Sequence, residues 1–178
     1  MLEHAKPTVF ILDVDGVMTS GHFFYSAEGK MFKAFGPDDH DSLGLIRSYL
    51  DIQFVTGDSK GFAISKKRIV DDMKFPLHLV STVSRLKWIA ERYNPAQVIY
   101  MGDGIFDHYV MRHVMYAIAP NNADAHAKRY AHYITQRNGG DRAVAEACLH
   151  ILEKFFTPYD PTALLNKEIS FSNQWSVS

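Results

Sequence analysis

Short apolar runs that do not alternate with polar residues constrain the fold of this chain most. Residues 8–12, 52–56 and 97–101 are such runs, typical of strands covered on both faces of a parallel sheet. Segments with helical spacing lie between them, among them 41–50 and 84–93, the latter opening on a serine that could cap it. This order predicts an α/β fold: a doubly wound, Rossmann-like parallel sheet with right-handed crossovers.

The remaining segments extend the same pattern. Short strands are predicted at 78–80, 116–118 and 133–135, and helices at 62–73, 106–114, 126–131 and 142–156. Two aromatic runs within residues 21–35 predict a β-hairpin after the first strand. A chain of 178 residues suits one domain. We assign that domain to residues 1–156 and expect residues 157–178 to form a C-terminal arm or tail.

The composition excludes several classes of function. A net charge of −1 provides no basic field that would attract nucleic acid or an anionic membrane. The apolar runs are too short to span a bilayer, and the first residues do not resemble a secretory signal. Because Cys148 is the single cysteine, neither an intrachain disulfide nor a cysteine-based zinc site is expected. A cytoplasmic location is the expectation that remains.

Acidic residues follow two of the predicted strands. Asp13 and Asp15 end the first strand, and Asp103 and Asp107 follow the strand at 97–101. In doubly wound sheets, ligands bind beyond the carboxyl ends of the strands. Clustered carboxylates repel one another unless a hard cation is bound, and Mg²⁺ prefers oxygen ligands and a substrate phosphate. These four aspartates are therefore the predicted Mg²⁺ ligands.

The residue types at this edge predict phosphoryl transfer. Asp13 would attack phosphorus, and Asp15 would protonate the leaving alkoxide and then activate water. Thr56, Gly57 and Lys87 would hold the phosphoryl oxygens. Each feature alone has a plainer interpretation: a polar turn, a strand end or a solvated lysine. Their ordered combination favours the chemistry.

These motifs resemble those of the haloacid dehalogenase superfamily. The stretch Asp13-Val-Asp-Gly-Val17 is similar to its first motif, Val55-Thr-Gly57 to the second, Lys87 to the third, and Gly102-Asp103 with Asp107 to the fourth. Between about residues 10 and 152 the chain resembles one branch, the 3-deoxy-D-manno-octulosonate 8-phosphate phosphatases. That resemblance implies a capless Mg²⁺-dependent enzyme of surface-polysaccharide biosynthesis. It also implies a small phosphorylated sugar acid as substrate and a homotetramer.

Departures from the branch pattern leave the substrate open. Asp58 stands where the branch has an arginine after Thr-Gly, and Gly139-Gly140-Asp141-Arg142 moves a second arginine by one position. The same catalysis on a different sugar phosphate is one alternative. A catalytically idle oligomeric subunit is another. A phosphotransferase would need a lid that the sequence does not offer.

Three further residues are candidates for substrate binding. His40 lies in a polar loop expected at the mouth of the site, Asp41 matches the branch, and Arg142 could reach a substrate carboxylate or phosphate. A solvated loop, a cap on the following helix and an ordinary first-turn arginine are the respective alternatives. Asp38 and Asp39 could join Asp41 in a second cation site, although a polar turn is the plainer interpretation. The aromatic residues of the hairpin predict an apolar patch that a partner covers.

Overall fold

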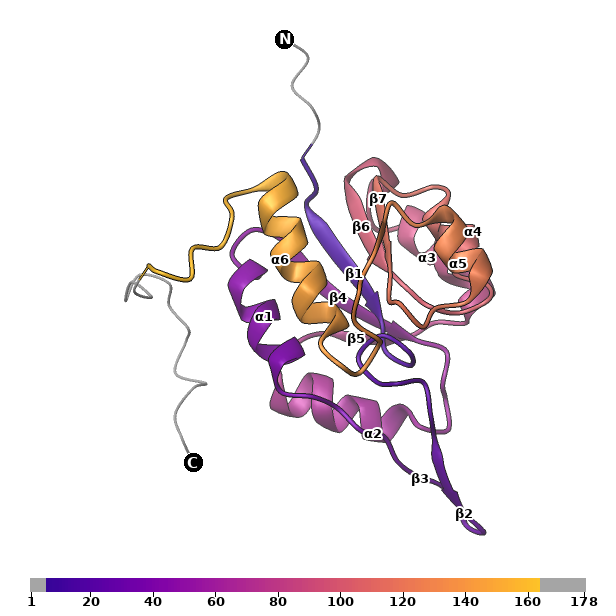
Figure 1. Cartoon of the computed structure of the whole chain (residues 1–178). Helices are drawn as coiled ribbons and strands as arrows, with labels where there is room; N and C mark the ends of the chain where they lie inside the picture. Colours follow the sequence, from indigo (N-terminus) through magenta and orange to yellow (C-terminus); the bar gives the residue numbers. More distant parts are fainter. Residues whose placement is uncertain (1–5, 164–178) are drawn as a thin grey trace.

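A six-stranded parallel sheet forms the centre of the molecule. The computed structural model describes residues 6–163. The strand order is β5-β4-β1-β6-β7-β8 (Figure 1). The strands are β1 Val9–Asp13, β4 Asp51–Thr56, β5 Leu77–Leu79, β6 Val98–Met101, β7 Tyr116–Ala119 and β8 Tyr133–Ile134. All five pairings in this sheet are parallel, so the doubly wound α/β prediction is confirmed.

Helices cover both faces of the sheet. On one face lie α1 Asp38–Ile46, α6 Ala143–Phe155 and the π-helical segment η1 Lys67–Asp72, which continues α2 Phe62–Lys66. On the other lie α3 Arg85–Ala90, α4 His108–Met111 and α5 Ala125–Tyr130 (Figure 1). Short 3₁₀ turns occupy Thr82–Ser84 and Pro95–Gln97. Strand β1 alternates between the two cores: Phe10 and Leu12 pack with α1 and α6, and Val9 and Ile11 pack with α3 and α4.

The predicted hairpin is present but shorter than expected. Its strands are β2 Phe24–Ser26 and β3 Gly29–Phe32, and it projects away from the body of the molecule (Figure 1). Four aromatic side chains, Phe23, Phe24, Tyr25 and Phe32, are exposed. Phe35 packs against the core. Between β1 and β4 the chain holds only this hairpin and α1, so there is no cap domain.

The chain around α3 and α4 departs from the sequence-based boundaries. The segment expected as one helix from Ser84 begins as a 3₁₀ turn, and the Ser84 side chain makes no capping hydrogen bond. Helix α4 is short because the residues before it form a turn, in which the Asp107 amide bonds to the Gly104 carbonyl. Within residues 6–163, no helix is long and apolar enough to cross a bilayer. Residues 157–163 are exposed, and most of the predicted tail, with Phe171 and Trp175, lies outside the described residues.

Candidate active site

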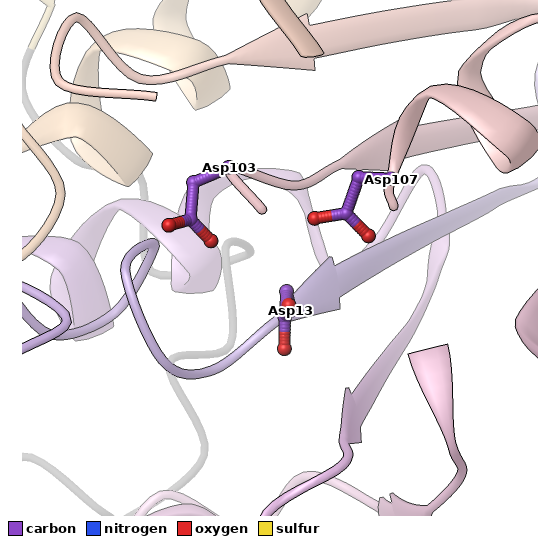
Figure 2. A group of neighbouring side chains, drawn as sticks. All are labelled: Asp13, Asp103 and Asp107. Atoms are coloured by element: carbon purple, nitrogen blue, oxygen red, sulfur yellow. The ribbon is translucent and has the colours of Figure 1, made fainter. Parts of the chain in front are cut away.

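Three aspartates converge where β1 and β6 end. The two strands are paired in parallel, so their carboxyl ends lie at the same edge of the sheet. Asp13 is the last residue of β1, and Asp103 and Asp107 belong to the loop that follows β6 (Figure 2). One carboxylate oxygen from each lies within 4.8 Å of the others. This grouping is the one on which the predicted metal site depends.

Glycines allow the backbone to approach this cluster closely. Gly16 has φ +94°, and a Cβ atom there would collide with the carboxylate of Asp103. A Cβ on Gly139 would collide with the Gly16 carbonyl oxygen. Thr19 braces the same loop, because its hydroxyl accepts hydrogen bonds from the Gly16 and Gly21 amides at 3.3 and 3.2 Å. The loop after β1 is therefore fixed between Asp103 and the segment before α6.

Among residues 6–163, the three carboxylates of the cluster outnumber the one cation that contacts them, Arg85. Burial and the nearby charges of Asp13 and Asp107 raise the pKa of Asp103 to about 8. Burial raises the pKa of Asp13 to about 6, although Arg85 acts in the opposite direction. The Oδ1 atom of Asp103 is buried and has no hydrogen-bond partner in the described part of the chain. Three carboxylates with an unpartnered buried oxygen fit a hard divalent cation such as Mg²⁺.

A buried arginine, Arg85, holds two of the three aspartates. Its guanidinium is 1% exposed and binds Asp13 through two nitrogens, at 2.6 and 3.0 Å. The Nη1 atom also donates to Asp107 and to the hydroxyl of Tyr100, both at 2.9 Å. Arg85 thereby orients the proposed nucleophile and supplies a permanent positive charge beside it.

The structure does not bring Lys87 to the site, contrary to the sequence-based expectation. Its side chain is 83% exposed, and its ammonium lies 3.9 Å from Glu91. Lys87 is two residues from Arg85, which places it on the opposite side of the helix. Arg85 instead shares the buried face of α3 with Ile89, four residues later. That i,i+4 spacing was the signal in the sequence that could have identified Arg85.

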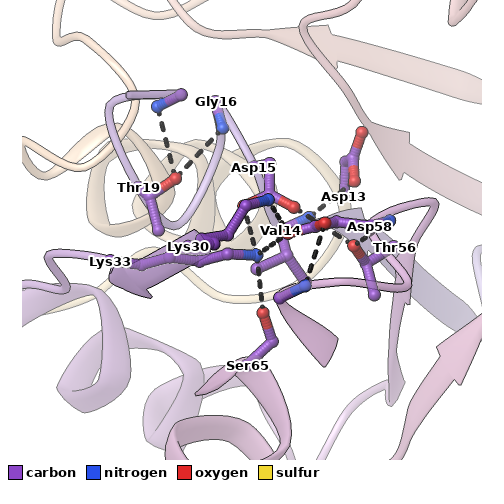
Figure 3. Close-up of polar contacts among 12 residues, drawn as sticks. Asp13, Val14, Asp15, Gly16, Thr19, Lys30, Lys33, Thr56, Asp58 and Ser65 are labelled. Carbon is purple, nitrogen blue, oxygen red and sulfur yellow. Dashed lines mark hydrogen bonds and ion pairs between the residues drawn. The ribbon is translucent and has the colours of Figure 1, made fainter. Parts of the chain in front are cut away.

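Asp15 lies outside the metal-ligand cluster. Its Oδ2 accepts a hydrogen bond from the Thr56 hydroxyl at 3.1 Å, and its Oδ1 lies 2.6 Å from the Lys33 ammonium (Figure 3). The structure therefore gives the Asp15 carboxylate partners other than a metal ion. Thr56 is fully buried at the end of β4, and the exposed Gly57 follows it.

Two lysines from the hairpin segment enter the site, and sequence reasoning missed both. Lys33 has a fully buried side chain and contacts Asp15, Asp58 and Ser65. Lys30 forms an ion pair with Asp58 and lies over the ring of Phe23, 3.3 Å from its centroid. Burial alone would raise the pKa of Asp58, but hydrogen bonds from the two lysines hold it at about 2.

The other predicted substrate-binding residues lie apart from the aspartate cluster. His40 is half-buried with its ring edge-on to Phe75, and burial lowers its pKa. Within residues 6–163, neither His40 nor Asp41 forms a side-chain hydrogen bond or ion pair with the cluster. Arg142 is exposed and pairs with Asp38 at 2.5 Å.

Asp39 does not form the second cation site that was considered with Asp38 and Asp41. It is buried, and its Oδ1 accepts a hydrogen bond from the Ala145 amide at 2.9 Å, in the first turn of α6. A cavity of about 250 Å³ lies beside it. The residues lining that cavity are Gly36, Pro37, Asp38, Asp39, Gly140, Asp141 and Arg142. None of the three clustered aspartates lines this cavity.

Comparisons with known proteins identify relatives of this chain. Residues 80–147 match a family described as haloacid dehalogenase-like hydrolase. The chain is 32% identical over 159 residues to the 3-deoxy-D-manno-octulosonate 8-phosphate phosphatase of Yersinia pestis, covering 83% of this chain and 81% of that protein. It is 33% identical over 153 residues to the enzyme of the same name from Escherichia coli K12, covering 79% and 76%. A crystal structure of the Yersinia pestis phosphatase superposes with a TM-score of 0.70 at 30% identity, covering 84% of this chain and 83% of that one.

Proposed function

This chain belongs to the haloacid dehalogenase-like hydrolases and is a phosphatase, and from that membership we propose a Mg²⁺-dependent phosphomonoesterase of small phosphorylated sugar acids. The substrate we propose is 3-deoxy-D-manno-octulosonate 8-phosphate or a related 2-keto-3-deoxy sugar phosphate, in the biosynthesis of surface polysaccharide. One observation carries the proposal: Asp13, Asp103 and Asp107 converge within 4.8 Å at the end of β1. The similarity to the Yersinia pestis and Escherichia coli enzymes supports the substrate.

In the first step, a carboxylate oxygen of Asp13 attacks the phosphorus of the monoester. The bond between phosphorus and the sugar oxygen breaks, and an aspartyl-phosphate forms. Asp15 donates a proton to the departing oxygen, which leaves as a sugar hydroxyl. Arg85 supports this step, because its bidentate contact fixes the orientation of Asp13.

In the second step, Asp15 takes a proton from water as the water attacks the aspartyl-phosphate. The bond between Asp13 and phosphorus breaks, inorganic phosphate is released, and both carboxyl groups return to their starting states. Thr56 supports both steps by a hydrogen bond that holds Asp15 at 3.1 Å.

Asp13, Asp103 and Asp107 are the residues that would hold the Mg²⁺ ion. When bound, the ion would neutralise charge on the phosphoryl oxygens and on the carboxylates. Arg142, which lines the 250 Å³ cavity beside Asp39, is our candidate for contact with the sugar portion.

We also propose that the active form is a homotetramer assembled through the hairpins. Phe24 is 48% exposed, Tyr25 62% and Phe32 55%, although each is an apolar or amphipathic ring on one small ribbon. A cluster of exposed aromatic side chains is unfavourable in water unless another surface covers it. A second copy of the same ribbon offers the same surface, as closed symmetric assemblies require.

Phosphate release from a panel of sugar phosphates tests the function. Wild-type protein with Mg²⁺ should release phosphate from an eight-carbon or nine-carbon 2-keto-3-deoxy sugar phosphate, and EDTA should abolish the release. Asp13→Asn should reduce the rate by roughly 10³-fold or more, since the nucleophile is lost. Asp72→Asn is the matched control, because Asp72 forms an exposed ion pair with Lys67 at 2.9 Å.

Other results of the substrate panel would favour one of the two alternative functions. Activity only on other sugar phosphates would retain the chemistry and replace the substrate. Equal inactivity of wild type and Asp13→Asn on the whole panel would favour an idle oligomeric subunit.

A further inference from the structure

The ammonium of Lys33 lies within 2.9 Å of three oxygen atoms of the protein. Asp15 Oδ1 lies 2.6 Å away, Asp58 Oδ2 2.9 Å and Ser65 Oγ 2.9 Å. A lysine ammonium carries three N–H donors and no acceptor. The Lys33 side chain is fully buried, and its ammonium is already surrounded by a hydroxyl and two carboxylates of the protein. Its position suits it to hold Asp15 rather than to bind substrate.

Asp58 closes a ring of contacts around Asp15 (Figure 3). On one side, the Asp58 carboxylate holds Lys33, which contacts Asp15. On the other side, the Asp58 amide donates to the Thr56 hydroxyl at 3.1 Å, and that hydroxyl donates to Asp15 at 3.1 Å. Both oxygens of Asp15 are thus reached from Asp58, one through Lys33 and one through Thr56.

Asp58 is itself held firmly in this position. Its Oδ1 accepts a hydrogen bond from the Gly61 amide at 3.0 Å, and Lys30 pairs with its Oδ2. The side chains of Lys30 and Lys33 are 4% and 0% exposed. The Asp58 carboxylate is thus the shared ion-pair partner of two almost fully buried lysines, whose charges need compensation at such low exposure.

We propose that Asp58 is a positioning residue for the proton-transfer step, whose carboxylate acts on Asp15 through Lys33. The inference rests on the proposed function, because it assigns Asp15 the transfer of a proton to the leaving oxygen. Without the Asp58 carboxylate, Lys33 and Lys30 lose a shared partner and repel each other. Lys33 then no longer fixes Asp15, and the proton donor loses its orientation.

A comparison of two leaving groups tests this proposal. Phenyl phosphate and 4-nitrophenyl phosphate are similar in shape, but phenoxide is a poor leaving group that needs a proton, whereas 4-nitrophenoxide leaves without one. The value of kcat/KM reports the reaction up to release of this group. For Asp58→Asn, we expect kcat/KM to fall about tenfold for phenyl phosphate, since a positioned acid contributes roughly 10²–10⁴-fold. We expect it to fall less than about twofold for 4-nitrophenyl phosphate.

The ratio of the two kcat/KM values is independent of the fraction of protein that is folded. Partial unfolding or a general distortion of the loop reduces both values equally and leaves the ratio unchanged. Asp15→Asn should cause the largest rise in the ratio of kcat/KM for 4-nitrophenyl phosphate to kcat/KM for phenyl phosphate. Lys33→Met should raise this ratio by about as much as Asp58→Asn does. Asp58→Glu keeps the charge and should restore most of the wild-type ratio. Asp72→Asn, which removes an exposed lysine partner, should leave it unchanged.

The possible results separate this proposal from the proposed function. An unchanged ratio in Asp58→Asn, with a raised ratio in Asp15→Asn, would overturn the positioning role and leave the phosphatase mechanism intact. Failure of the wild type to hydrolyse either ester with Mg²⁺ would overturn both. A raised ratio in Asp58→Asn that Asp58→Glu reverses would support the proposal.

Discussion

Arg85 connects Asp13 and Asp107 through a single buried guanidinium. It is the one cation in contact with the aspartate cluster among residues 6–163. Removal of one partner from a buried ion pair leaves a charge without compensation, which costs more than the pair itself contributes. The charge of Arg85 therefore affects both the stability and the chemistry of this site.

Arg85→Met should lower the free energy of unfolding by about 3 kcal/mol or more and abolish phosphate release. Lys87→Met should change neither measurably, because the Lys87 ammonium is exposed and 3.9 Å from Glu91. Urea unfolding and phosphate release with Mg²⁺ would measure both properties. A loss of activity in Lys87→Met with Arg85→Met unaffected would show that Lys87, and not Arg85, supports catalysis.

The free energy of unfolding should depend on pH because the carboxylates of the cluster ionise at different pH values in the folded and unfolded states. The pKa of Asp103 is about 8 in the folded protein, above its ordinary value of 3.8. Between these values the folded state binds more protons than the unfolded state. In the absence of metal, this contribution to stability is therefore present at low pH and lost as pH rises toward 8.

Mg²⁺ should reverse this loss, since it binds ionised carboxylates and displaces their protons. We expect the increase in Tm caused by Mg²⁺, relative to EDTA, to be larger at pH 8 than at pH 5.5. Asp103→Asn should remove most of that difference. Thermal unfolding at the two pH values provides the measurement, and an Mg²⁺ effect that is larger at pH 5.5 would contradict the expectation.

Sequence spacing identified the acidic residues of the site but none of the cations that contact them. Asp13, Asp103 and Asp107 follow strands whose position is set by local apolar runs, so their meeting point could be predicted. Lys33 could not be found in this way, because its contact with Asp15 depends on how the hairpin folds back. Such long-range ion pairs leave no local pattern in the sequence.

At the scale of elements, the strands were predicted better than the helices. Buried strands such as Val9–Asp13 carry a continuous apolar run, which marks both ends. Helix His108–Met111 is shorter than its pattern indicates, because Asp107 folds the preceding residues into a turn. Strand Gly29–Phe32 ends early, and the next residue, Lys33, is buried in the site. Both differences arise where the chain supplies a side chain to the site.

The contact between Gly139 and the Gly16 loop leaves no room for a side chain at residue 139. Gly139→Ala places a methyl group against the Gly16 carbonyl and should destabilise the protein by about 2 kcal/mol through overpacking. Activity should fall with it, because the Gly16 loop abuts Asp103. Gly36→Ala is the matched control, since its nearest contact, the Gly140 carbonyl at 3.9 Å, is ordinary. Similar melting temperatures for the two variants would show that the Gly16 loop shifts to accommodate the added methyl group without loss of stability.

For the whole molecule, we predict that the exposed hairpin is covered by the hairpins of other subunits in a homotetramer. Light scattering at micromolar concentration should give the mass of a tetramer for the wild type. Phe24→Asp with Phe32→Asp should give a smaller species, because the stacked pair of rings, 4.7 Å apart, is the centre of the apolar ribbon. Leu149→Asp is the control, as Leu149 is an exposed apolar residue on α6. A wild-type monomer would contradict the proposed assembly.

The close packing of Gly16 against Gly139 also joins two segments that are distant in the sequence. One follows the strand that carries Asp13, and the other precedes α6. Thr19 braces the loop from within, but the contact with residue 139 forms only once these two segments have met. Catalytic competence is therefore expected to appear with the assembled tertiary structure, and a fragment that carries the nucleophile without α6 should not acquire it.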